Sequence, residues 1–307
     1  MDQPARLPPS RRMREILDSP AWFEALSLSE RAALLTDNAD FPHAERLERA
    51  ERKAHRWRTE ADLLDDQGFA ERLALDGLTP DLFLRILATP TAVLREHLDG
   101  LPDWLTTLGR LFSQPAPPLP AHLQDNLGIL EVLRPLIADA YTQIRTGLHR
   151  IATTTSPAPF DPEAIGPQLL DALLRRLRWA SERALVLELH ASRLEGKLQG
   201  ETPEERFQSF LSSLRQPGTA LEILERYPVL ARDACRHAGQ WVETSLEMME
   251  RFSVDRGELI DRLVAGSDPG LVTEVRSGLS DRHAGGRSVA ILTFASGWRA
   301  VYKPKPL

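Results

Sequence analysis

The residues best suited to chemistry lie near the C-terminal end of the chain. Asp281, His283, Gly285 and Gly286 share one loop, and Lys303 follows after two short apolar segments. Small residues free backbone N–H groups to surround phosphate oxygens, and a lysine on a neighbouring strand neutralises their charge. This order of loop, strand, turn, strand and lysine is therefore compatible with binding a phosphate-bearing ligand.

The same residues also have purely structural interpretations. Lys303 could be a solvated lysine on an edge strand, where a charge prevents edge-to-edge pairing. Asp281 is a common turn former, and His283 could be an ordinary loop histidine. From spacing alone, both the functional and the structural interpretation stay open.

A β-hairpin must position this loop and the lysine. Residues 288–294 are rich in β-branched and apolar side chains, residues 295–297 supply a tight turn, and residues 298–303 form the returning strand. Alternation along that strand places Tyr302 on one face and Lys303 on the other. An isolated hairpin is marginal in water, and we identify no further strand. We therefore expect a chain shortened relative to a longer ancestor.

Most of the remaining sequence predicts helices separated by proline-rich breaks. Thr79 and Pro80 form a helix start, and residues 202–205 form a capping box. A long apolar pattern without proline or glycine follows Pro167 and predicts a central helix that ends near Gly196.

These elements predict a mainly α fold with three parts. The first is a helical N-terminal subdomain, residues 1–120, which ends at the proline-rich connector 113–120. The second is a helical subdomain with the long central helix, residues 121–276. The third, residues 277–307, begins a β-lobe.

Composition excludes several classes of protein. The chain has 38 Lys and Arg against 44 Asp and Glu, a net charge of −6, so general nucleic-acid binding is disfavoured. One cysteine, Cys235, makes neither an internal disulfide nor a zinc ribbon. No signal peptide or spanning segment is found, and no metal-ligand motif accompanies His190. We therefore expect a cytoplasmic protein with no metal site of its own.

Residues 281–307 resemble the loop, strand and V-Y-K-P segment of the class II lanthipeptide synthetases (LanM). Four upstream stretches are similar to the dehydratase region of that family, in the same order: residues 74–79, 187–194, 200–207 and 227–232. The similarity covers roughly residues 15–307.

This resemblance implies a kinase-like lobe and an activity. These enzymes use ATP and Mg²⁺ to phosphorylate Ser and Thr of a leader-bearing precursor peptide, and then eliminate the phosphate. A separate C-terminal zinc domain adds cysteine thiols to the resulting alkenes. By motif position, Lys303 corresponds to the ATP-phosphate lysine, Gly285 and Gly286 to the phosphate loop, and Asp281 and His283 to residues of the phosphate chemistry. Ser280 departs from the glycine that is usual in the family.

The resemblance also leads us to expect missing parts. No residues after Leu307 supply the catalytic and metal-binding acids of a large lobe, or the cyclase. We therefore expect an N-terminal dehydratase fragment that binds nucleotide weakly, is inactive alone, and is completed by a separate chain if at all. The alternative is a helical module that binds a peptide or protein without ATP chemistry. The arginines at 175, 176 and 178 form either a charged helix face or a docking groove for an acidic leader peptide.

Overall fold

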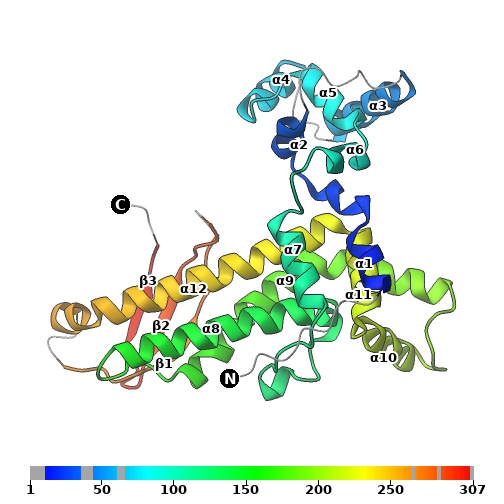
Figure 1. Ribbon diagram of the computed structural model, residues 1–307. Helices are drawn as coiled ribbons and strands as arrows, with labels where there is room; N and C mark the ends of the chain where they lie inside the picture. The colour runs from blue at the N-terminus through cyan, green and yellow to red at the C-terminus, as the bar shows by residue number, and fades with distance from the viewer. Residues whose placement is uncertain (1–10, 36–43, 61–65, 264–266, 282–284, 305–307) are drawn as a thin grey trace. The chain divides into compact units, whose positions relative to one another are not determined.

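The computed structural model describes residues 11–35, 44–60, 66–263, 267–281 and 285–304. These residues form mainly helices, with a small β-sheet near the C-terminus (Figure 1). The predicted mainly α fold with a C-terminal β region is confirmed. The chain divides into two compact units, residues 17–105 and residues 1–16 with 106–307. The subdomain boundaries proposed from the sequence, at 120 and 276, stay predictions.

The unit of residues 17–105 is a cluster of short helices. Its core centres on Phe83 and Ile86, which pack with Ala54, Leu73 and Leu78. The Thr79 hydroxyl accepts a hydrogen bond from Leu82 N at 3.1 Å, which confirms the predicted helix start. The elements that contribute to this unit are η1 (Pro20–Ala25), α2 (Leu28–Leu34), α3 (Ala44–Glu60), α4 (Asp66–Leu75), α5 (Pro80–Ala88) and α6 (Thr91–Glu96).

Three long helices form the centre of the larger unit: α8 (Arg134–Thr154), α9 (Pro162–Leu194) and α12 (Pro228–Leu263). Each of the three packs against the other two. Trp241 of α12 is buried, and its indole Nε1–H donates a hydrogen bond to the Leu169 carbonyl of α9 at 3.1 Å. Among the described residues, no helix has the length and apolar content to cross a membrane.

Shorter elements complete this unit. They are α1 (Arg11–Leu17), α7 (Asp103–Phe112), η2 (Ala121–Leu123), η3 (Gly128–Leu133), α10 (Pro203–Leu214) and α11 (Pro217–Arg226); α1 and α7 extend across the division between the two units. The capping box predicted at the start of α10 is present, since Thr202 and Glu205 bond reciprocally to each other's backbone N–H.

The start of α9 differs from the prediction. The helix begins at Pro162, with Asp161 as its N-cap, and Pro167 lies inside it. Asp161 Oδ1 accepts from Glu163 N at 3.0 Å, so a complete start signal precedes Pro167. Pro167 removes one hydrogen bond, to the Glu163 carbonyl in the first turn, and the helix continues past it.

The β region is a three-stranded antiparallel sheet in the order β1-β2-β3. Its strands are β1 (Val272–Arg276), β2 (Ala290–Phe294) and β3 (Arg299–Tyr302). The predicted hairpin is present as β2 and β3, but the expectation that it has no sheet partner is wrong, because β1 pairs with β2. A bulge between Val272 and Glu274 interrupts the alternation of β1 and hides its pattern in the sequence.

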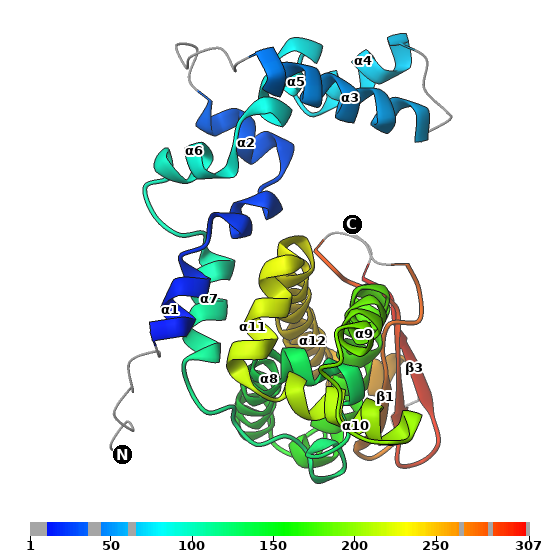
Figure 2. The same cartoon turned by 90° about the vertical axis from the view of Figure 1, so that its right-hand side faces the viewer.

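One face of the sheet is buried against the long helices. Ala290, Leu292 and Phe294 of β2 are buried, and the ring of Phe294 lies 5.7 Å from that of Phe252 in α12. The strands lie beside α9 (Figure 2), which contacts β1. Gln168 of α9 caps the edge of β1, since its side chain donates to Thr273 O and accepts from Val275 N.

Replacing Trp241 by Phe tests the link between α9 and α12. The change removes the indole donor and part of the ring, so we expect a loss of about 1–2 kcal/mol in the free energy of unfolding. Urea denaturation measures this value. Trp179→Phe is the control, because the side chain of Trp179 is 80% exposed. Equal stability of the two variants would contradict a structural role for this hydrogen bond.

The pKa of Cys235 provides a second test of how α12 packs. Burial raises the pKa of its thiol to about 12, so the reactive thiolate is scarce near neutral pH. We expect iodoacetamide to alkylate Cys235 at about pH 8 roughly two to three orders of magnitude more slowly than an exposed thiol. The rate should increase as the pH rises, and urea should abolish the protection. Fast alkylation of Cys235 in the folded chain at neutral pH would contradict the burial of its thiol.

Candidate functional site

The glycine-containing loop is closed at its base by two serines. The Ser288 hydroxyl accepts from Gly278 N at 3.2 Å, and the Ser280 hydroxyl accepts from Val289 N at 3.0 Å. Leu279 N also donates to the Val289 carbonyl at 3.2 Å. Ser280, the position where the sequence departs from the LanM pattern, therefore closes the loop with its side chain.

Gly286 brings the loop close to two helices. Its φ is +100°, a conformation that favours glycine. A Cβ at this position would lie 3.1 Å from Gln240 Oε1 of α12 and 3.5 Å from Arg176 Nη1 of α9. Arg176 in turn donates to Gln240 Oε1 at 3.1 Å. The glycine therefore permits an approach that a side chain would block.

Arg287 ties the next residue of the loop to α12. Its Nε and Nη2 atoms lie 2.9 Å and 2.7 Å from Glu247 Oε2. Glu247 also pairs with Arg251 of the same helix, at 2.5 Å. The hydrogen bond from Arg287 and the charge of Glu247 raise the pKa of the Arg287 guanidinium. One carboxylate thus connects the loop to the middle of a long helix.

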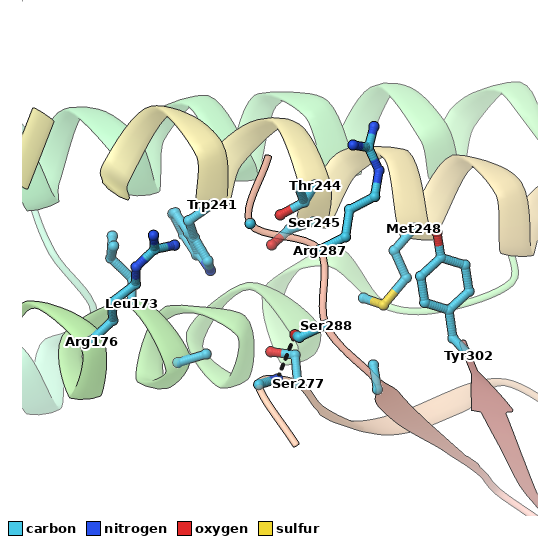
Figure 3. Close-up of a pocket in the computed structure, with 14 residues that line it drawn as sticks. Leu173, Arg176, Trp241, Thr244, Ser245, Met248, Ser277, Arg287, Ser288 and Tyr302 are labelled. Carbon is cyan, nitrogen blue, oxygen red and sulfur yellow. Dashed lines mark hydrogen bonds between the residues drawn. The ribbon is translucent and has the colours of Figure 1, made fainter. Parts of the chain in front are cut away.

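A small pocket lies between this loop, the two helices and the sheet (Figure 3). Arg176 comes from α9, Trp241 and Thr244 from α12, and Tyr302 from β3, while Arg287 comes from the loop itself. The cavity volume is about 70 Å³, enough for a few water-sized groups. The Arg176 guanidinium and the glycine suit an anion such as a phosphate, while the Arg287 guanidinium is paired with Glu247.

The structure separates the residues predicted for the site. Gly286 lines the pocket, whereas Gly285, Asp281 and Lys303 are exposed and do not line it. Lys303 follows β3 directly, and Tyr302 before it faces the pocket. His283 lies outside the described residues. The roles predicted for these five positions stay predictions.

Several residues of the pocket were not identified from the sequence. Arg176 was treated only as part of an arginine run, yet the three arginines differ. Arg175 donates to Ser277 O and Arg176 lies against Gly286, while Arg178 is exposed. Glu247 and Tyr302 belong to no sequence motif that would mark them as site residues. Their proximity to the loop depends on how α9, α12 and β3 pack, which local patterns do not specify.

The resemblance implies ATP and Mg²⁺, and the described residues suit part of the ATP molecule better than they suit the metal ion. Arg176 and Gly286 suit a phosphate group, but the pocket is too small for a whole nucleotide. In the described part of the chain, no group of three or more His, Cys, Asp or Glu side chains is placed to hold a metal ion.

Glu247→Gln tests whether α12 fixes the loop. The variant keeps the shape of the side chain but removes the charge that pairs with Arg287, so we expect faster amide hydrogen exchange in residues 285–289. Mass spectrometry of peptides from the exchanged chain measures the change. Glu258→Gln, at an exposed position of the same helix that pairs with Arg262, should leave exchange in the loop unaltered. Identical exchange in both variants would show that the ion pair does not hold the loop.

Comparison with known proteins gives two matches. Residues 227–307 match a family model described as a domain of unknown function, DUF4135. The chain is also 31% identical over 126 residues to the lacticin 481/lactococcin biosynthesis protein LcnDR2 of Lactococcus lactis subsp. lactis. That stretch covers 41% of this chain and 13% of the relative. These matches confirm the resemblance found in the sequence: the chain is similar to the lanthipeptide synthetases of the LanM type.

Proposed function

We propose that this chain serves the dehydration step of lanthipeptide synthesis. The support is its similarity to a protein named for lacticin 481 and lactococcin biosynthesis, over 13% of that protein's length. The structural observation that carries the proposal is the glycine-containing loop, which leads into a β-hairpin and is anchored on two long helices. The small sheet thus connects the two glycines, which precede β2, with Lys303, which follows β3.

The proposed substrate is a precursor peptide with Ser and Thr residues. Bound ATP, with Mg²⁺, would supply the phosphoryl group. The Ser or Thr hydroxyl oxygen would then form a bond to the terminal phosphorus, ADP would be the leaving group, and the hydroxyl proton would pass to a base. In the elimination, a base takes the α-proton, a C=C bond forms, and the C–O bond breaks as phosphate departs.

The chain's own residues would bind and orient the phosphates. Lys303 would supply a positive charge, and the glycines at 285 and 286 would supply backbone N–H groups that no side chain covers. Arg287 and Glu247 keep the loop on α12, so its conformation is set before a ligand arrives. Asp281 is the acid that the resemblance assigns to the phosphate chemistry.

A second function has one observation in its favour. Lys303 is exposed and does not line the pocket that holds Gly286, Arg176 and Arg287. A helical module that binds a peptide or protein without ATP would not need these groups to converge.

Nucleotide binding by the Lys303→Ala variant separates the two functions. If the chain binds ATP, removing the charge should weaken binding of a fluorescent ATP analogue with Mg²⁺ by at least about tenfold. Lys197→Ala is the control, because Lys197 is an exposed lysine that pairs with Glu195. No binding, or equal binding by all three chains, favours the module without ATP chemistry.

Mass spectrometry of a lanthipeptide precursor incubated with the chain, ATP and Mg²⁺ tests whether the chain carries out the reaction alone. A mass gain of one phosphoryl group or a loss of water would contradict the inactivity expected from the sequence. Asp281→Asn should suppress any such product, while Asp255→Asn on α12 should not.

A further inference from the structure

The outward side of α9 between Arg175 and Leu194 carries large apolar side chains in solvent. Trp179 is 80% exposed, Leu187 59%, Leu194 81% and Val186 40%. The helix packs against α8, α12 and β1 with its other side, and Figure 2 shows α12 on one side of it and the strands on the other. Exposed apolar side chains grouped in this way mark an interaction surface.

The exposed residues follow the helical repeat. Trp179, Arg183, Val186 and His190 are spaced at i, i+4, i+7 and i+11, so they form one stripe along the helix. Leu187 and Leu194 flank the stripe on one side. From Arg175 to Leu194 the surface extends for about 28 Å, at about 1.5 Å per residue. This length matches a partner helix of about five turns.

The same surface is basic, although the chain as a whole has a net charge of −6. Four exposed arginines, at positions 175, 178, 183 and 193, accompany a single exposed glutamate, Glu182. The guanidinium groups of Arg178, Arg183 and Arg193 make no ion pair or hydrogen bond with any residue that the structure describes. Their charges are therefore available to an acidic partner.

We propose that this face of α9 docks an acidic, amphipathic helix of the peptide substrate. The identification of that helix with the substrate rests on the proposed function. An amphipathic helix binds through apolar anchors spaced along one side, and Trp179 is the central anchor here. Carboxylates on the flank of the partner meet the arginines, which gives the charge complementarity that selects an acidic peptide over a basic one.

Fluorescence anisotropy with a designed helical peptide tests the surface. The probe is a labelled peptide of about 20 residues with Leu on one face and Glu beside it. We expect it to bind the whole chain without nucleotide, and a peptide with Lys in place of Glu to bind at least about tenfold more weakly. Trp179→Ala and Arg183→Glu should each weaken binding of the acidic probe by about tenfold or more.

Two variants elsewhere in the chain are matched controls. Val254→Ala removes an apolar side chain of α12 that is 82% exposed, and Arg236→Glu makes the same change of charge on that helix. Both should bind the acidic probe as the unaltered chain does. Circular dichroism of all four variants confirms that they fold. Equal affinity of all variants, or of both peptides, overturns the proposal.

Further outcomes separate this proposal from the proposed function. A Trp179→Ala change that converts a dimer into a monomer without weakening peptide binding would overturn it in favour of an interface between copies. A lanthipeptide precursor that fails to compete with the bound probe would overturn the identification of the partner as substrate. Lys303→Ala should bind the probe normally. If the unaltered chain binds the probe but no ATP analogue, the proposed function is contradicted and the docking surface stands.

Discussion

The small sheet has one apolar face, and burying that face on α9 and α12 is the constraint on which the site depends. A sheet with one apolar face must bury that face against another element. Phe294 packs on Phe252 of α12, and Gln168 of α9 caps the free edge of β1. Both ends of the loop that contains Gly286 are therefore attached to strands whose position the helices determine.

The loop is also held directly. Gly286 lies against Gln240 of α12 and Arg176 of α9, and Arg287 pairs with Glu247 of α12. A shift of α12 along α9 would have to break or rearrange these contacts together. The Trp241 hydrogen bond to α9 opposes such a shift close to the same place. The conformation of the loop is thus a property of the helix pair rather than of the loop sequence.

The sequence predicts what local chemistry determines. Thr79 and Thr202 cap helices through hydrogen bonds within three residues, so their patterns suffice. The strand β1 was not predicted from the sequence, because its bulge disturbs the alternation of side chains. Its partner strand β2 also lies on the far side of the glycine-containing loop. Gly286 was identified because glycine is informative by itself. Arg176 and Glu247 were not, since each reaches the loop only through tertiary packing.

The two sides of α9 also limit how peptide docking could affect the loop. One side contacts the sheet and the loop, and the other carries Trp179, Arg178, Arg183 and Arg193. A ligand on the outer side shifts an equilibrium inside only if it binds two arrangements of the chain with different affinity. A well-packed helix offers no such difference by itself. Docking on α9 would therefore raise the local concentration of a peptide beside the loop, and would alter the loop only if α9 moved relative to α12.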